Sequence, residues 1–383
     1  MPPRSARSPR RSGSRSSRSF DRLPWRRLGR WLIPLVALLT ASLGIAACSG
    51  GGGDAAVPIS TVAPEPTSTE PPAPTSSTTA STIPVPSGPI APLTGLVESV
   101  TPLGRPALAV KIDNHRDSRP PAGIDLADLV LESRAEGVTR FMAVFHSMTP
   151  SVLGPVRSSR TTDFNLLTAL DTPLYGSSGG NAAVLRGLRG LPIYALTAMS
   201  ENVYYRARGR LGPHNLFVDA NDLFALAPAD ATPPEPWFTY RSADAALGSS
   251  ARALSGEITV SFRNSPIVGF IWDDALSGWA RSQDGQPHVT EAGERIAPAN
   301  VVVMVADYRR SSADPNSPEL VSTGEGELYV LTAGAMIEGT WTRERASDKP
   351  TLIDSTGQPI LLTPGQTWIL FPEGAPEETP SGQ

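Results

Sequence analysis

The sequence predicts a mixed α/β (α+β) domain over residues 92–232, followed by a β-rich domain over residues 233–373. In the first region, segments with the apolar spacing of a helix alternate with strand-like segments, whereas almost every later segment has the pattern of a strand. A proline-dense stretch at residues 228–236 indicates a junction between the two. Residues 374–383 are expected to form a disordered tail.

The strands of the first domain are predicted from apolar runs and from alternation. Residues 106–113 (PALAVKID) are nearly all apolar up to their last residue, which is typical of a buried strand. Residues 129–136 and 139–147 alternate strongly around Gly137 and Val138. Two alternating segments joined by a glycine-containing turn predict a β-hairpin.

Three short helices are predicted between these strands and the junction. Each has apolar residues at helical spacing, and two begin at side chains that commonly cap a helix. The helices are expected at residues 161–170, with Thr161 or Thr162 as the cap, at residues 182–188, and at residues 219–226, with Asp219 or Asn221 as the cap.

The second domain is predicted to consist almost entirely of strands that Gly, Asp and Pro turns separate. The expected strands are residues 258–263, 268–272, 301–306, 327–332, 336–342 and 367–371.

The N-terminus predicts export and lipidation. An arginine-rich segment precedes about 15 apolar residues at 31–45, which are short for a membrane-spanning helix and suit a signal peptide over residues 1–47. The segment ends in Ile-Ala-Ala followed by Cys48, a pattern that resembles the lipobox of bacterial lipoproteins. Cys48 is therefore the expected lipidation site, and its acyl chains would hold the protein to the outer face of a membrane. An uncleaved signal anchor is the alternative.

Residues 48–91 are predicted to be a disordered linker, because a segment rich in Gly, Pro, Ser and Thr cannot bury enough apolar surface to fold. Beyond residue 47 the chain has a formal charge of about −13, and an acidic protein is repelled by phosphate backbones. We therefore expect no nucleic-acid partner. Because the chain has one cysteine, it can form no intrachain disulfide.

Polar side chains gather at the predicted ends of strands and starts of helices, where binding sites are common in α/β domains. Several are arginines, which suit a carboxylate- or phosphate-bearing ligand. The candidate ligand-binding residues are Asp113, Asn114, His115, Arg119, Glu132, Arg140, Arg157, Ser158, Arg160, His214 and Asn215. The alternative is a structural ion-pair network, for instance Glu132 with Arg157 or Asp113 with Arg140.

Catalytic and metal chemistry have weaker support. Asp113, His115 and His214 are residue types that ligate metals, and Ser158, His214 and Asp113 are the types of a nucleophile triad, but neither set lies in a recognised motif. The glycine-rich residues 176–180 suit either an anion at backbone amides or a tight turn. We assign no catalytic residue, no metal and no cofactor from the sequence.

Short motifs throughout residues 92–371 resemble the YerB-like family of bacterial lipoproteins, DUF3048. The resemblance implies two domains, surface anchoring and a role in the cell envelope, but no reaction. Two positions depart from the family pattern: Pro121 stands where glutamine is common, and the turn at residues 136–138 is one glycine shorter. The motifs are Pro92-Leu93-Thr94-Gly95, Ile112-Asp113-Asn114-His115, Arg119-Pro120, Ala127-Asp128, Glu136-Gly137, Thr139-Arg140-Phe141, Gly154-Pro155-Val156-Arg157-Ser158 with Arg160, Pro213-His214-Asn215, Asn300-Val301, Gly339-Thr340-Trp341 and Pro364-Gly365-Gln366-Thr367-Trp368.

Three functions are compatible with these observations. The first is a surface-anchored binding or scaffolding module whose arginines and His214 hold a cell-wall polymer or an envelope protein. The second is an envelope hydrolase that acts on a glycan or peptide, with Asp113, Glu132 or His214 as acid or base. The third is a structural lipoprotein without a ligand.

Overall fold

The structure is a computed structural model that describes residues 88–98, 101, 103–242, 245–265 and 267–380. The predicted signal peptide, Cys48 and residues 48–87 of the predicted linker lie outside the described residues. Among the helices of the described part, none combines the length and the apolar character needed to cross a lipid bilayer.

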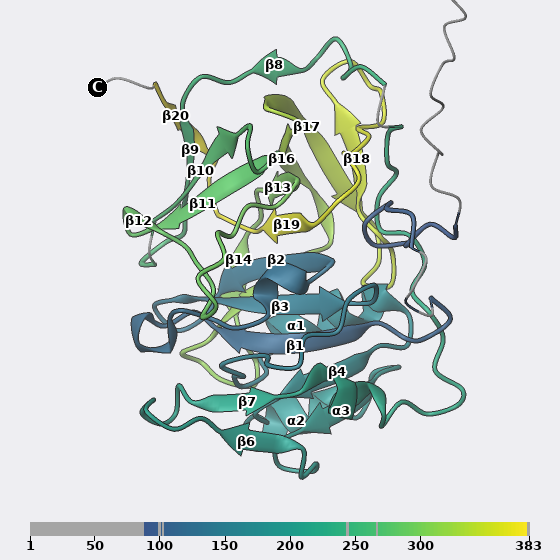
Figure 1. The fold of residues 1–383 in the computed structure, drawn as a ribbon, viewed down its shortest axis with the longest axis vertical. Helices are drawn as coiled ribbons and strands as arrows, with labels where there is room; N and C mark the ends of the chain where they lie inside the picture. Colours follow the sequence, from purple (N-terminus) through teal and green to yellow (C-terminus); the bar gives the residue numbers. More distant parts are fainter. Residues whose placement is uncertain (1–87, 99–100, 102, 243–244, 266, 381–383) are drawn as a thin grey trace, which may run out of the picture. The chain divides into compact units, whose positions relative to one another are not determined.

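An eleven-stranded sheet dominates this β-rich chain (Figure 1). Its strands follow one another in the order β18-β17-β16-β13-β19-β2-β3-β1-β4-β5, and β8 pairs with β17. The strands are β1 (Leu108–Asp113), β2 (Leu129–Arg134), β3 (Thr139–Phe145), β4 (Leu174–Ser177), β5 (Tyr194–Thr197), β8 (Arg252–Ala253), β13 (Asn300–Met304), β16 (Gly324–Thr332), β17 (Ala335–Arg343), β18 (Thr351–Asp354) and β19 (Thr367–Leu370).

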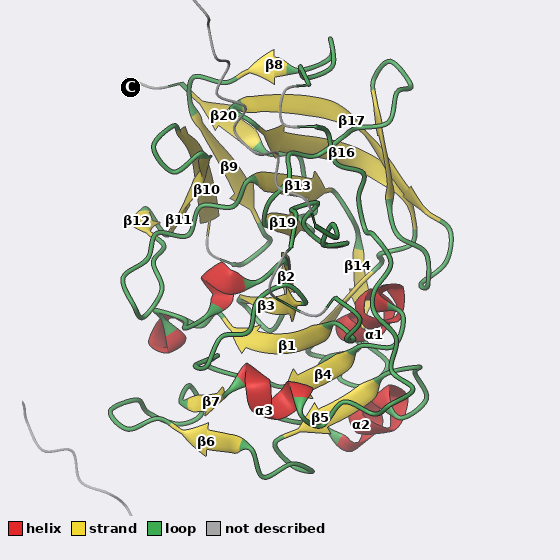
Figure 2. Ribbon diagram, turned by 45° about the vertical axis from the view of Figure 1, so that its right-hand side comes forward, coloured by secondary structure: helices red, strands yellow, loops and turns green. Residues whose placement is uncertain are grey.

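Smaller elements surround this sheet. A five-stranded sheet has the order β12-β11-β10-β9-β20, and two hairpins pair β6 with β7 and β14 with β15. Figure 2 shows how short the helices are. The bounds are β6 (Tyr204–Arg206), β7 (Leu216–Val218), β9 (Glu257–Ser261), β10 (Ile267–Asp273), β11 (Gly278–Gln283), β12 (Gln286–Pro287), β14 (Tyr308–Arg310), β15 (Pro318–Leu320), β20 (Glu377–Thr379), α1 (Thr162–Leu167), α2 (Ala182–Leu188) and α3 (Ala220–Phe224), with 3-10 turns at Arg116–Ser118, Ile124–Leu126 and Thr168–Leu170.

Both faces of the central strands of the main sheet are buried, which explains why these strands are mostly apolar. In β1, Val110 belongs to a core cluster that also contains Leu223 of α3 and Phe270 of the smaller sheet. The neighbouring Ala109 belongs to the cluster on the opposite face, together with Val184 of α2. The sheet therefore supports different elements on its two sides.

Most predicted elements of the first region are confirmed. The hairpin forms as β2 and β3, with Gly137 at a φ of 68° in its turn. The helix predicted at residues 182–188 is α2. The first helix differs at its start, because Thr161 has helical dihedrals and makes no capping hydrogen bond, while Asp163 Oδ2 accepts a hydrogen bond from the Arg160 backbone N–H.

The regions on either side of the predicted junction share the main sheet. Strand β19 pairs in parallel with β2, with Thr367 opposite Leu129 and Leu370 opposite Glu132. Side chains that lie far apart in the sequence are therefore neighbours along this seam. In addition, residues 377–379, which the sequence assigned to a disordered tail, form β20 and pair with β9.

Candidate functional site

The candidate site lies where two parallel strands separate. Strands β1 and β4 pair up to Val110 and Gly176, and beyond that point residues 155–157 lie beside β1. The backbone N–H of Asp113 donates to the Pro155 carbonyl at 2.9 Å, and that of Arg157 donates to the Lys111 carbonyl at 2.8 Å. Crevices at the carboxyl ends of parallel strands are common binding positions.

A second loop brings His214 to the same place. Leu216, at the start of β7, accepts a hydrogen bond from the Val156 N–H through its carbonyl, so the residues that precede β7 approach the end of β1. The His214 Nδ1 lies 2.7 Å from Asp113 Oδ2, and Asp113 Oδ1 accepts the His115 N–H at 3.1 Å. Because a carboxylate only accepts hydrogen bonds, Nδ1 of His214 donates in this contact, and Nε2 makes no hydrogen bond to a described residue.

Arg157 completes this Asp113 cluster, which consists of Asp113, His214 and Arg157. Its Nε lies 3.2 Å from Asp113 Oδ2, but without hydrogen-bond geometry, so that nitrogen is buried without a hydrogen-bond partner. Among the described residues no acceptor bonds its two terminal amino groups, and its side chain is 23% exposed. Arg157 therefore holds a positive charge and unused donors at an accessible position.

Two more of the candidate arginines, Arg140 in the hairpin and Arg160 in the loop, form ion pairs with Glu136. Arg140 donates to Glu136 Oε2 at 3.1 Å and to the Ser158 carbonyl, while Arg160 donates to both Glu136 oxygens. Burial alone raises the pKa of Glu136, but the hydrogen bond from Arg160 and the charges of Arg140 and Arg160 outweigh it and hold that pKa at about 2. Each terminal nitrogen of Arg140 and Arg160 thus already donates to an oxygen, and of their side-chain nitrogens only the buried Nε of Arg140 has no partner among the described residues.

A buried ion pair occupies the interior beneath the site. Arg281 of β11 bonds both Glu132 oxygens, at 2.9 and 3.1 Å, and both side chains are fully buried. Thr139 donates to Glu132 Oε1 and accepts from Asn114 Nδ2. The Arg281 guanidinium also lies 4.9 Å from the ring centroid of Trp368, which indicates a cation–π contact.

The ion pairs named in the sequence analysis are therefore wrong in their partners. Glu132 pairs with Arg281 rather than with Arg157, and Asp113 pairs with Arg157 rather than with Arg140. Arg281 itself was missed, because it lies 149 residues from Glu132. Its only local signal is a single charged side chain inside the otherwise uncharged strand segment GWARSQ.

The remaining candidate residues position loops. Arg119 pairs with Asp284 at 2.7 Å and donates to the Asn114 carbonyl. Asn215 accepts from Arg206 at 2.6 Å. Ser158 Oγ lies 3.0 Å from Ser178 Oγ. Of the possible nucleophile triad, the structure thus joins Asp113 with His214, but the Ser158 hydroxyl is paired with another serine.

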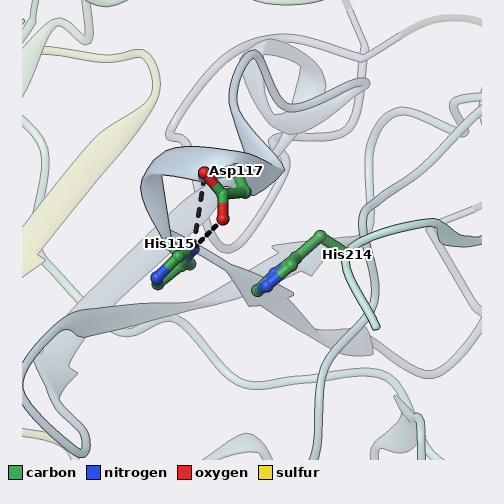
Figure 3. A group of neighbouring side chains, drawn as sticks. All are labelled: His115, Asp117 and His214. Atoms are coloured by element: carbon green, nitrogen blue, oxygen red, sulfur yellow. Dashed lines mark hydrogen bonds and ion pairs between the residues drawn. The ribbon is translucent and has the colours of Figure 1, made fainter. Parts of the chain in front are cut away.

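Three possible metal ligands meet at the edge of the Asp113 cluster (Figure 3). His115, Asp117 and His214 each offer a ligand atom within 4.8 Å of the others. However, the two imidazole rings are stacked, with centroids 4.6 Å apart and planes 14° from parallel. Imidazole binds a metal through a lone pair in its ring plane, so one ion cannot lie in both planes. The arrangement fits a metal only after the His115 ring turns, and Asp113 would then support His214 rather than bind the ion.

The comparisons with known proteins establish the family. The chain matches "Protein of unknown function (DUF3048) N-terminal domain" over residues 93–232 and "Protein of unknown function (DUF3048) C-terminal domain" over residues 258–369. It therefore belongs to the DUF3048 family, as the sequence motifs predict.

A curated relative and a solved structure agree with this assignment. The chain is 27% identical over 290 residues to the Bacillus subtilis (strain 168) protein "Putative lipoprotein YerB", covering 73% of this chain and 85% of that protein. The crystal structure of YerB from Bacillus subtilis matches with a TM-score of 0.65 and 23% identity, over 75% of this chain and 99% of the other. The structural match shows that the two share a fold.

Proposed function

We propose that this protein is a membrane-anchored extracytoplasmic lipoprotein that binds an anionic envelope ligand at the Asp113 cluster. The carrying observation is the contrast among its arginines: Arg140 and Arg160 are engaged by Glu136, whereas Arg157 has two amino groups without an acceptor among the described residues. A guanidinium fork of this kind suits a carboxylate or a phosphate.

Pairing of the carboxylates supports binding rather than acid–base catalysis. Asp113, Glu132 and Glu136 each contact at least one arginine, so no carboxylate of the candidate set is left without a cation. A ligand at this site can bind the two terminal amino groups of Arg157 and Nε2 of His214. The name of the Bacillus subtilis relative, a lipoprotein, supports the predicted anchor at Cys48.

The Asp113–His214 pair favours an envelope hydrolase as the second candidate. A histidine that donates through Nδ1 to a buried carboxylate has its Nε2 available as a general base. Ser158 does not supply a nucleophile at that nitrogen, because its hydroxyl is paired with that of Ser178.

Binding to purified envelope polymers tests the first proposal. The full chain in detergent micelles is titrated with soluble peptidoglycan fragments, which carry carboxylates, and with a phosphate-containing wall polymer. Arg157→Gln is expected to weaken binding of one of them by at least about tenfold, the loss of a charge-assisted hydrogen bond. Arg134→Gln is the matched control, because Arg134 pairs with Glu373 away from the site.

The outcomes separate the candidates. Unchanged binding in Arg157→Gln, or an equal loss in Arg134→Gln, contradicts the anion site. Release of a cleaved product that stops in His214→Gln but continues in Arg157→Gln supports the hydrolase. The anchor is tested separately, since Cys48→Ser should abolish labelling by radioactive fatty acid and release the protein from the membrane fraction.

A further inference from the structure

A mainly apolar cavity lies apart from the Asp113 cluster. Its volume is about 430 Å³, which is within the range of pockets that bind small organic molecules. Its walls are residues 122–123, 125–126 and 150–152 from the N-terminal family region and residues 290–292 from the C-terminal one. None of these residues belongs to the Asp113 cluster, so the cavity is a separate place at which a ligand could bind.

The loops that form the walls are fixed by backbone contacts. The Glu291 N–H donates to the Pro121 carbonyl at 2.8 Å, which holds the loop of the C-terminal family region against the N-terminal one. Gly123 has a φ of 76°, and a Cβ at this position would lie 2.6 Å from the Val152 carbonyl oxygen. Glycine therefore permits the close approach of the two N-terminal loops, and the cavity has a defined shape.

One carboxylate in the wall of this cavity has no cation. Asp125 is half-buried, and its carboxylate keeps surface that solvent can reach. Apart from its own backbone N–H, no described residue donates a hydrogen bond to it, and no described lysine or arginine forms an ion pair with it. Burial, together with the charge of Glu294, raises the pKa of Asp125. A bound cation would offset both effects.

The arginines near this cavity have carboxylates of their own. Arg210 lies 3.2 Å from Glu291, which is the other carboxylate in the cavity wall. Arg295 donates to a backbone carbonyl at 2.8 Å, and the charge of Asp273 acts on its guanidinium. Each arginine is thus balanced, and neither compensates Asp125. The cavity therefore combines apolar walls with an excess of negative charge.

We infer that this cavity binds a small organic cation, with an ammonium group at Asp125 and an apolar body against Leu126, Pro150 and Val152. The ammonium group supplies the charge and the hydrogen-bond donors that Asp125 lacks. The apolar body covers wall surface that is otherwise in water, including Val152, whose side chain is 43% exposed. Because the walls come from both family regions, the ligand would contact both.

Isothermal titration calorimetry of the full chain in detergent micelles tests this inference. The probes are benzylammonium, the uncharged benzyl alcohol, and ammonium chloride, which has no apolar body. All are titrated at constant ionic strength, and the heat of the same titration into protein-free micelles is subtracted. Benzylammonium is expected to bind saturably, and each of the other two should bind at least about tenfold more weakly.

Asp125→Asn is the decisive variant. It keeps the size of the side chain and removes the charge, so the affinity for benzylammonium should fall at least about tenfold. Glu294→Gln removes the same charge from an exposed side chain outside the cavity wall and should lower the affinity by no more than about threefold. Circular dichroism of both variants checks that the fold is kept.

A bulky side chain gives a second, steric test. Ala292→Trp fills the cavity from an exposed position in its wall and should abolish binding of benzylammonium. Ala275→Trp adds the same side chain on an exposed turn outside the cavity wall and should leave binding unchanged. Arg157→Gln should also leave it unchanged, so this inference and the proposed anion site can fail separately.

Four results overturn the inference. The first is the absence of saturable heat from benzylammonium. The second is equally tight binding of benzyl alcohol, which means that the cavity selects apolar character and not a cation. The third is an equal loss in Asp125→Asn and Glu294→Gln, which means only diffuse electrostatics. The fourth is binding that persists in Ala292→Trp or is lost in Arg157→Gln, which means that the ligand binds elsewhere.

Discussion

The Asp113 cluster contains the same three kinds of side chain as the Glu132–Arg281 pair with His288, whose Nδ1 accepts a hydrogen bond from Arg281. The two groups differ in burial. Each has a buried carboxylate, an arginine and a histidine. The Arg281 side chain is fully buried and bonds both oxygens of Glu132, whereas the Arg157 side chain is 23% exposed and only touches Asp113. The fully buried Glu132–Arg281 pair can stabilise the fold, whereas the partly exposed Asp113 cluster can bind a ligand. Burial and pairing geometry, rather than residue type, therefore separate stability from binding.

The comparison predicts the largest loss of stability at Arg281. Arg281→Met leaves the Glu132 charge buried without its cation, which should lower the free energy of unfolding by about 3–5 kcal/mol. Urea denaturation of the full chain measures this value. Combining Glu132→Leu with Arg281→Met removes both charges and should be less destabilising than Arg281→Met alone. A double variant as unstable as the single one would mean that packing, not the ion pair, dominates.

Asp113→Asn should have an intermediate effect. Asp113 is buried and lies against His214 and Arg157, and the uncharged amide weakens these contacts, so a loss of about 1–3 kcal/mol is expected. Thermal unfolding compares this variant with Asp117→Asn, where the carboxylate is exposed and the change should stay within about 0.5 kcal/mol. Equal effects of the two variants would show that the Asp113 cluster adds nothing to stability.

The sequence identifies local structure and the residues of the site better than it identifies their partners. Alternation and a glycine turn predict the hairpin of β2 and β3, and the motifs identify Asp113, Arg157 and His214, which the structure brings together. The partner of Glu132 depends on how β19 joins β2 and on where the smaller sheet packs. No local pattern contains that information.

Local sequence patterns also do not show that the two predicted domains share one sheet. A proline-dense stretch indicates a break in regular structure, but it cannot show that strands on its two sides pair in one sheet. The pairing of Thr367 with Leu129 joins residues more than half the chain apart.

Glu136 should make a smaller, pH-dependent contribution to the stability of the fold. Its pKa is about 2 in the folded protein and 4.5 as an ordinary glutamate, so its pairing with Arg140 and Arg160 stabilises the fold fully above pH 4.5. That contribution is lost as the pH falls from 4.5 towards 2, because the folded carboxylate must then take up a proton. The unfolding temperatures of wild type and Glu136→Gln should therefore converge over this range. A constant difference would contradict the pairing.

Arg157→Gln should have the smallest effect on stability. Its side chain is partly exposed and makes no well-aligned hydrogen bond to any described residue, so the free energy of unfolding should change by at most about 1 kcal/mol. The same substitution should nevertheless remove most of the affinity for the anion. Arg281→Met, in contrast, is expected to act mainly on the free energy of unfolding. Urea denaturation and polymer binding measured on one preparation give both values. If Arg157→Gln destabilised the protein as much as Arg281→Met does, Arg157 would be a structural residue. The proposed difference between the Asp113 cluster and the Glu132–Arg281 pair would then be contradicted.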